Sequence, residues 1–286
     1  MNIMLLGSTG YLGGNIASYL VKQGHKVFCI IRQSSDINFL KNLGVCIVFS
    51  EWDQIEKVFM REKIDWVVNS VCTRELTPDR YRNIFDSNMF FPLNVLSLAI
   101  KYKVENYVTM GTGLPREFNI YAFSKNKFSE IGEFLSKVNN INFVELRLEM
   151  LYGGQNEPET SFIKNCCRKL IRNDSLLLTT GNQKRDIIRV EDVTEIIGIL
   201  LKRNYIKGYQ ALSVGSGEQH SIREIVTYMK QIMHSDSDLQ FGKIADRLGE
   251  PDTLADISWL KNIGYELQYT YFGGLKEECV REMANL

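Results

Sequence analysis

A glycine-rich run directly follows the first apolar segment of this 286-residue chain. Residues 3–6 have the pattern of a buried strand, and the run Gly7-Ser8-Thr9-Gly10-Tyr11-Leu12-Gly13 lies between them and a helical stretch. Glycines spaced in this way let a pyrophosphate approach the backbone, and the N–H groups at a helix start favour an anion. Turn chemistry alone can give the same spacing, but the position favours a dinucleotide site. The expected cofactor contacts are Gly7, Thr9, Gly10, Tyr11, Leu12 and Gly13.

Short apolar runs and helical stretches alternate along the first half of the chain. The runs expected to form strands cover residues 27–31, 46–49, 66–68, 107–108 and 143–146. The expected helices cover residues 11–22, 37–42, 54–61, about 78–101 and 121–138. Pro92 predicts a kink or a break in the fourth of these helices. Strands alternating with helices predict right-handed crossovers and an α/β, Rossmann-type, doubly wound parallel sheet.

The alternation loosens after about residue 152. Residues 162–171 and 190–202 have helical patterns, residues 211–214 form an apolar run, and Ser221 to Glu224 has the form of a capping box. We therefore expect a dinucleotide-binding lobe over residues 1–152. Residues 153–286 are expected to form mainly a smaller substrate-binding lobe, with some segments returning to the first.

Composition excludes several classes of function. Lys plus Arg and Asp plus Glu both number 34, and no long basic run occurs, which argues against nucleic-acid binding. No apolar stretch has membrane-spanning length, and Met1 leads directly into the first apolar run, so we expect a cytoplasmic protein without a membrane partner. Six cysteines without a Cys-x-x-Cys pair, and only three histidines, argue against a metal site and a Ser-His-Asp relay.

The end of the second predicted strand indicates which dinucleotide is preferred. An acidic residue at this place usually binds the ribose of NAD, whereas an arginine accommodates the 2′-phosphate of NADP. Here Arg32 follows the strand, and Ser34 and Ser35 come shortly after it. These three residues are the expected 2′-phosphate contacts, so the sequence favours NADP(H) over NAD(H). A solvated arginine on a loop is the alternative.

Tyr121 and Lys125 are four residues apart and share one face of a predicted helix. The ammonium would lower the pKa of the phenol, which is ordinarily near 10, and could bind the nicotinamide ribose. Tyr121 could then exchange a proton with a substrate oxygen while a hydride moves. Thr112 follows the strand at residues 107–109, where ligands of open α/β sheets collect, and could orient the substrate carbonyl. The alternative for Thr112 is an ordinary loop residue.

These motifs, together with the segment 185–193, resemble the extended short-chain dehydrogenase/reductase family, whose members modify nucleotide-activated sugars. The runs 68–72, 88–94 and 121–128 are most similar to its branch of CDP-abequose and CDP-paratose synthases, which are 4-ketoreductases. The resemblance implies a Rossmann lobe, NAD(P), a nucleotide-sugar substrate, a homodimer, and catalytic roles for Thr112, Tyr121 and Lys125. The candidate substrate contacts in the second lobe are Phe162, Lys164 and Arg185, and a structural ion pair is the alternative for Arg185.

The chain also departs from the family pattern. Met110 and Gly111 stand where serines commonly precede the catalytic Thr, and Met150 replaces a frequent polar contact. Gly113 and Leu114 follow Thr112, where a 4,6-dehydratase of the family has Asp-Glu, so elimination is disfavoured. We therefore expect NADPH-dependent reduction of the C4 keto group of a nucleoside-diphosphate 4-keto-deoxysugar. The alternatives are a nucleotide-sugar 4-epimerase and a non-catalytic dinucleotide-binding sensor.

Overall fold

The computed structural model describes residues 1–74, 77–202 and 207–284, and it divides into two compact units. The first unit comprises Met1–Arg147 and Thr194–Leu212, and the second comprises Leu148–Val193 and Ser213–Leu286. The sequence predicts a lobe boundary near residue 152. The main segment of the first unit ends at Arg147, a few residues earlier. Thr194–Leu212 is the segment that returns to the first unit.

Seven strands form the central sheet, in the order β11-β6-β5-β4-β1-β2-β3. They are β1 (Asn2–Leu6), β2 (Lys26–Ile31), β3 (Cys46–Phe49), β4 (Trp66–Asn69), β5 (Asn106–Thr112), β6 (Asn142–Leu148) and β11 (Tyr209–Val214). β1 pairs in parallel with both β2 and β4, β2 continues to β3, and β4 to β5. The strand order thus reverses between β1 and β4, which confirms the doubly wound fold. Ligands of such sheets bind at the carboxyl ends of the strands beside this reversal.

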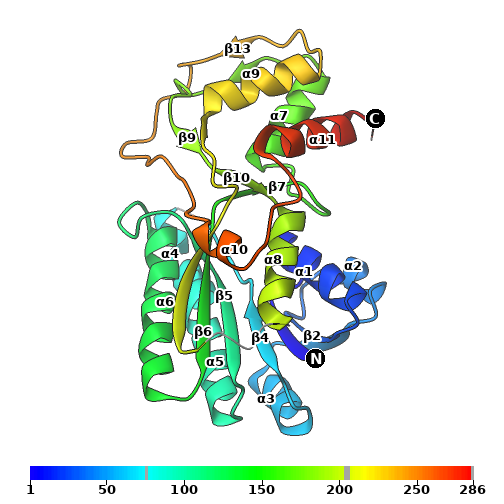
Figure 1. Ribbon diagram of the computed structural model, residues 1–286, viewed down its shortest axis with the longest axis vertical. Coiled ribbons are helices and arrows are strands. Elements are labelled where there is room, and N and C mark those ends of the chain that lie inside the picture. Colours follow the sequence, from blue (N-terminus) through cyan, green and yellow to red (C-terminus); the bar gives the residue numbers. More distant parts are fainter. Residues whose placement is uncertain (75–76, 203–206, 285–286) are drawn as a thin grey trace. The chain divides into compact units, whose positions relative to one another are not determined.

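Helices cover both faces of this sheet (Figure 1). They are α1 (Tyr11–Lys22), α2 (Asn38–Lys41), α3 (Trp52–Arg61), α4 (Tyr81–Phe85), α5 (Phe91–Lys101), α6 (Ile120–Val138) and α8 (Val190–Lys202). Gly198 lets α8 approach α1 closely, because a Cβ at this position would lie 2.4 Å from the ring of Tyr19. On the other face, α3 packs against α5.

The helix predicted over residues 78–101 is interrupted. A 3₁₀ turn η1 (Pro78–Arg80) and α4 lead into a π-helical turn η2 (Asp86–Phe90), after which α5 begins. Pro92 lies in the first turn of α5, where its missing N–H would have no partner within the helix. The helical run continues through Pro92, and a π turn rather than a break lies directly before it. The π turn carries Asn88, which is fully buried.

The second unit is built from short two-stranded pairs and helices. Its strands are β7 (Met150–Tyr152) with β10 (Ile187–Arg189), β9 (Lys184–Arg185) with β12 (His220–Ser221), and β8 (Leu176–Leu177) with β13 (Leu239–Gln240). Its helices are α7 (Phe162–Ile171), α9 (Ile222–Ile232), α10 (Ser258–Asn262) and α11 (Tyr271–Ala284). The predicted capping box is present, because Ser221 and Glu224 exchange hydrogen bonds at the start of α9. A separate apolar core joins α7, α9 and α11.

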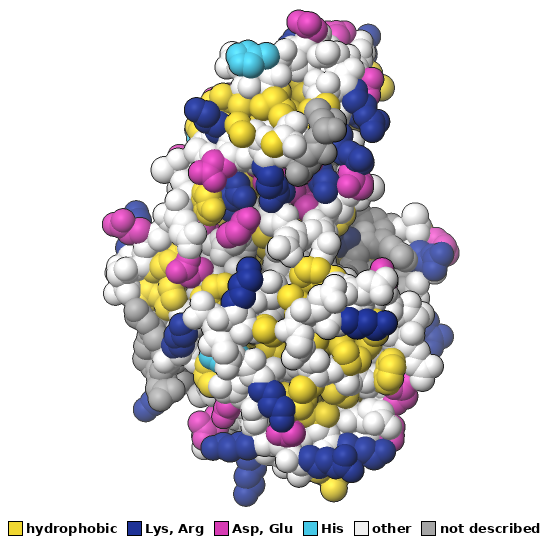
Figure 2. Space-filling model, turned by 90° about the vertical axis from the view of Figure 1, so that its right-hand side faces the viewer, with side chains coloured by type: hydrophobic (Ala, Val, Ile, Leu, Met, Phe, Trp, Pro, Cys, Tyr) yellow, Lys and Arg dark blue, Asp and Glu magenta, His cyan; other side chains and the backbone are white. Residues whose placement is uncertain are grey.

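Charged side chains of both signs are interspersed over the face of the molecule drawn in Figure 2. This face therefore carries no broad patch of one sign, in keeping with the equal numbers of basic and acidic residues. None of the helices in the described ranges combines the length and the apolar character needed to cross a bilayer.

Candidate functional site

The turn between β1 and α1 is packed tightly against the end of β4. Gly7 has a φ of +79°, and a Cβ on it would lie 2.8 Å from the backbone nitrogen of Val71. A Cβ on Gly13 would lie 2.0 Å from the carbonyl oxygen of Gly7. Both positions therefore require glycine for steric reasons. Gly10 is less crowded, because the atom nearest to a Cβ on it would be Gly7 O, at 3.3 Å.

The same turn forms the start of α1 without a capping side chain. Gly10 is the N-cap in an extended conformation, and no side chain bonds to the helix start from this position. The backbone N–H of Gly10 donates to Gly7 O at 3.0 Å, which closes the turn. A glycine-lined helix start of this kind fits a pyrophosphate. The predicted contacts Thr9, Tyr11 and Leu12 lie in or beside this turn.

Arg32 directly follows β2, and its side chain is exposed. The backbone N–H of Ser35 donates to Arg32 O at 3.0 Å, so residues 32–35 form a tight turn that holds Arg32 at the carboxyl end of the strand. Ser34 is also exposed, and the Ser35 hydroxyl has no hydrogen-bond partner among the described residues. The structure thus brings the three predicted 2′-phosphate contacts together in one turn.

Lys125 is buried, with 3% of its surface exposed, and ties the ends of two strands together. Its Nζ donates to Val71 O at 2.7 Å and to Met110 O at 2.8 Å. Val71 follows β4 and also packs against Gly7, so the ammonium lies close to the glycine turn. An ammonium has three N–H donors, and these two bonds leave one for a ligand. Burial lowers the pKa of Lys125.

Thr112 and Tyr121 complete the predicted catalytic set. Thr112 is the last residue of β5, and its Oγ1 accepts a hydrogen bond from the backbone of Leu114 at 3.2 Å. Its hydroxyl hydrogen remains available to a substrate oxygen. Tyr121 is the second residue of α6, and Asn119 caps that helix by accepting from Ala122 N at 2.8 Å. The side chain of Tyr121 is 5% exposed.

The sequence correctly places Tyr121 and Lys125 on one helix, but it predicts the wrong source of charge for the phenol. Burial raises the pKa of Tyr121 above its ordinary value, and Arg74 opposes this effect. The guanidinium carbon of Arg74 lies 5.1 Å from the centre of the Tyr121 ring. Lys125 instead directs two of its N–H groups to carbonyls. Sequence reasoning missed Arg74, whose only signal was its position five residues after the end of β4.

Asn88 fixes the segment that carries Arg74 to the helix that carries Tyr121. Its Oδ1 accepts from Thr73 N at 2.8 Å, and its Nδ2 donates to Thr73 O at 2.9 Å and to Ser124 Oγ at 3.0 Å. Ser124 Oγ in turn donates to Tyr121 O at 2.7 Å. One buried amide, carried by the π turn, therefore joins the loop at Thr73 to the first turns of α6.

Glu145 fills the room left by Gly111. A Cβ on Gly111 would lie 2.5 Å from Glu145 Oε1, so the carboxylate occupies the space of a side chain at that position. Glu145 is buried, and its Oε2 accepts from Tyr209 Oη at 3.0 Å and from Arg147 Nε at 3.1 Å. This explains why the chain has glycine where serine is common in the family. The sequence alone gave no sign of this pairing.

The three candidate substrate contacts of the second unit differ in their surroundings. Phe162 and Lys164 lie in the first turn of α7, and Lys164 Nζ pairs with Glu159 at 3.3 Å. Arg185 is buried and forms an ion pair with Glu250, and it also donates to Pro251 O at 2.7 Å. The structure therefore places Arg185 in the structural ion pair that the sequence had left open as the alternative.

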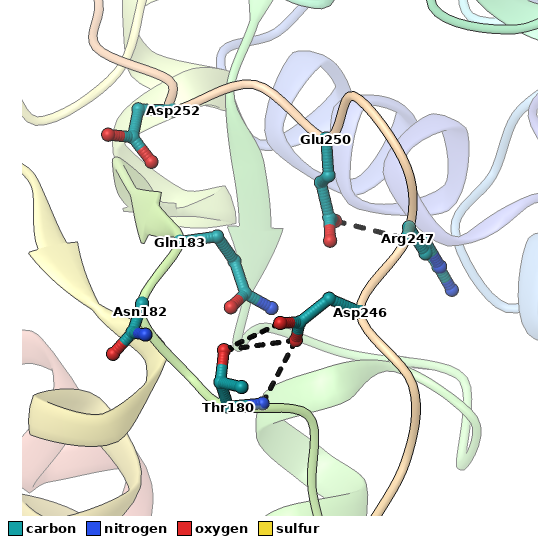
Figure 3. Close-up of a pocket in the computed structure, with 7 residues that line it drawn as sticks. All are labelled: Thr180, Asn182, Gln183, Asp246, Arg247, Glu250 and Asp252. Carbon is teal, nitrogen blue, oxygen red and sulfur yellow. Dashed lines mark hydrogen bonds and ion pairs between the residues drawn. The ribbon is translucent and has the colours of Figure 1, made fainter. Parts of the chain in front are cut away.

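A polar pocket of about 310 Å³ lies in the second unit (Figure 3). Its lining residues are Thr180, Asn182, Gln183, Asp246, Arg247, Glu250 and Asp252. Asp246 accepts hydrogen bonds from the backbone N–H and the hydroxyl of Thr180 at 2.9 and 2.8 Å. Three carboxylates and two amides face the pocket, so it suits a ligand rich in hydrogen-bond donors.

The chain is similar to known proteins in both sequence and fold. Residues 3–215 match the NAD dependent epimerase/dehydratase family. CDP-abequose synthase of Salmonella typhimurium is 29% identical to the chain, over 96% of each protein. The fold superposes on a UDP-glucuronic acid 4-epimerase of Bacillus cereus in complex with UDP-glucuronic acid and NAD, with a TM-score of 0.86, 19% identity and full coverage of both chains. A dTDP-glucose 4,6-dehydratase of Bacillus anthracis in complex with NAD gives a TM-score of 0.84 at 19% identity, covering 100% of this chain and 97% of the other.

Asn88→Ala should destabilise the protein by about 1–3 kcal/mol, because it leaves the buried Thr73 backbone groups without their partner. Urea denaturation measures the change. Asn83→Ala, on the exposed side of α4, is the matched control and should stay within about 0.5 kcal/mol of the parent. Equal losses in the two variants would contradict the role given to the Asn88 amide.

Proposed function

The chain belongs to the NAD-dependent epimerase/dehydratase family, and we propose that it reduces the C4 keto group of a nucleoside-diphosphate 4-keto-deoxysugar with NADPH. One observation carries the proposal: Val71 packs against Gly7 and also accepts the hydrogen bond of Lys125. The glycine turn and Lys125 therefore meet just after β4, and Thr112 at the end of the neighbouring β5 and Tyr121 on α6 would supply the groups that a carbonyl reduction needs.

The residues of the site divide the chemistry among them. NADPH, when bound at the glycine turn, would supply the hydride for C4 of the sugar. Thr112 would donate a hydrogen bond to the keto oxygen and orient it. Tyr121 would transfer its proton to that oxygen, and the phenolate would regain a proton from water. Lys125 would hold the ribose of the cofactor with its remaining N–H. The overall change consumes one proton and one reduced cofactor for each alcohol formed.

The preference for NADPH rests on the turn at residues 32–35. The exposed Arg32 guanidinium and the exposed Ser34 at the end of β2 would provide positive charge and hydrogen bonds for a 2′-phosphate, whereas the Ser35 hydroxyl is buried. A reductase that consumes its cofactor at each turnover gains from this preference. An epimerase, by contrast, returns the hydride to the same substrate and keeps its dinucleotide.

Similarity to known proteins and the chemistry of the site both support the proposed substrate. The similarity to CDP-abequose synthase spans nearly the whole chain and supports a nucleotide sugar in deoxysugar biosynthesis. In the second unit, Phe162 and Lys164 offer an aromatic ring and a cation for the nucleotide. The polar pocket of the same unit has carboxylates and amides for sugar hydroxyls or a base amine. Arg185 would act indirectly, because its guanidinium holds Glu250 at the edge of this pocket.

We also infer that the protein is a homodimer that pairs through α6. Phe134 and Val138 are 63% and 60% exposed, and Phe123 is exposed on the same helix. Phe134 and Val138 are four residues apart and form a short exposed apolar stripe, and the Lys127–Glu130 ion pair lies on the same face between this stripe and Phe123. An exposed apolar stripe of this kind is a common feature of protein interfaces.

Turnover tests the proposed reaction. Purified protein should oxidise NADPH, followed at 340 nm, when it is given CDP-, UDP- or dTDP-linked 4-keto-deoxyhexoses. Tyr121→Phe should lower kcat by about 10²–10⁴-fold, because the proton donor is lost, while NADPH still binds. Interconversion of C4 epimers without net NADPH consumption would identify an epimerase. Binding of NADPH with no conversion of any sugar would identify a dinucleotide sensor.

Cofactor binding tests the assignment of Arg32. The parent should bind NADPH more tightly than NADH, and Arg32→Ala should weaken NADPH binding by about 10–100-fold through loss of charged hydrogen bonds. Fluorescence titration measures both constants, and NADH serves as the internal control because it lacks the 2′-phosphate. A parent that binds the two cofactors equally would exclude this preference.

Light scattering after size exclusion tests the dimer. The parent should have twice the mass of the chain, and Phe134→Glu should yield a monomer, because it places a charge in the apolar stripe. Met60→Glu is the control, since Met60 is 69% exposed on α3, outside the stripe. A monomeric parent would contradict the homodimer, and a dimeric Phe134→Glu variant would exclude this surface.

A further inference from the structure

The phenol of Tyr121 has a second cation beside it, apart from the lysine of its own helix. The guanidinium carbon of Arg74 lies over the Tyr121 ring, 5.1 Å from its centre, and the charge of Arg74 acts on the phenol. Tyr121 is almost completely buried, whereas Arg74 is exposed. Arg74 therefore contacts the phenol from the solvent side, while the rest of the ring is enclosed by protein.

The position of Arg74 is built into the fold. Arg74 follows Thr73, whose backbone N–H and carbonyl both bond to the amide of Asn88. The same amide donates a hydrogen bond to Ser124 Oγ, which in turn donates to the carbonyl oxygen of Tyr121. The backbone that carries the guanidinium and the backbone that carries the phenol are thus joined through a single fully buried side chain. A flexible surface arginine without such a connection would not be held over the ring.

We propose that Arg74 is a positioning residue for the reduction, which stabilises the negative charge that develops on Tyr121 when its proton passes to the keto oxygen. This inference rests on the proposed function. Lys125 is less able to perform the task, because two of its N–H groups bond to Val71 O and Met110 O. A guanidinium stays charged at any working pH and interacts favourably with both the face of the ring and the phenolate oxygen.

The electrostatic surroundings of Tyr121 agree with this role. Burial raises the pKa of the phenol, and Cys72 acts in the same direction, whereas Arg74 lowers it. Cys72 and Arg74 both belong to the segment after β4, and Lys125 is the charged group one turn further along α6. A buried phenol without a nearby cation would be a weaker acid, and proton transfer to the substrate would become slower.

The decisive comparison is between Arg74→Met, which removes the charge, and Arg74→Lys, which keeps it. In steady-state assays of NADPH oxidation with the best 4-keto sugar nucleotide, Arg74→Met should lower kcat about tenfold or more. The alkaline limb of its kcat–pH profile should move to higher pH, because the phenol holds its proton more strongly. Arg74→Lys should restore the position of that limb, and the Kd for NADPH should stay within about threefold of the parent in both variants.

A second measurement does not depend on turnover. Tyrosinate absorbance at 295 nm, taken as the difference between each protein and its own Tyr121→Phe counterpart, reports the ionisation of this one phenol without cofactor or substrate. The parent should show more phenolate than Arg74→Met at the same alkaline pH. If no sugar nucleotide is reduced by the parent, the proposed function fails, but this titration still decides the effect of Arg74 on Tyr121.

Two results would overturn the inference. Equal phenolate fractions in the parent and Arg74→Met at every pH below unfolding would show that Arg74 does not act on the phenol. An unmoved alkaline limb together with a higher KM for the sugar nucleotide or a higher Kd for NADPH would make Arg74 a phosphate ligand instead. Arg74→Gln provides an independent neutral variant should Arg74→Met fail to fold.

Discussion

The hydrogen bonds from the Lys125 ammonium to the carbonyls of Val71 and Met110 are the constraint on which this site depends. A buried cation is costly unless polar groups replace its water, and here two strand ends supply the replacement. The bonds hold the end of β4, the end of β5 and the start of α6 in one arrangement. Because Val71 also packs against Gly7, that arrangement extends to the turn expected to bind the phosphates. A residue that is predicted to be catalytic thus also ties two strand ends together.

Most of the fold follows from local patterns in the sequence. The bounds of α1, α7 and α8 agree with the prediction, because buried apolar residues recur at helical spacing in each of them. The π turn at Asp86–Phe90 could not be predicted, since it is set by the tertiary contacts of Asn88 with Thr73 and Ser124. Pro92 indicated that the helix must be interrupted there, but the form of the interruption depends on residues distant in sequence.

In the candidate site, too, some residues could be predicted from local sequence patterns, whereas others depend on contacts between residues far apart in the sequence. Gly7, Gly13, Thr112, Tyr121 and Lys125 could be predicted from their spacing along the chain and from their places after strands or on one helix. Arg74 could not be found, because its role depends on a contact across 47 residues with the ring of Tyr121. The ion pair of Arg185 with Glu250 is equally distant in sequence, so the residues alone left its role open between a ligand and a structural partner.

The glycine at residue 111 shows how such distant contacts alter the chemistry of a site. Without a side chain there, the Glu145 carboxylate lies against the backbone of β5, next to the residue whose carbonyl binds Lys125. Burial lowers the pKa of Lys125, and the charge of Glu145 works against that effect. Because Gly111 has no side chain, the Glu145 carboxylate can lie against it, and this buried carboxylate favours the protonated form of Lys125. The protonated form of Lys125 donates to the carbonyls of Val71 and Met110. The glycine at residue 111 therefore supports the arrangement that holds the two strand ends together.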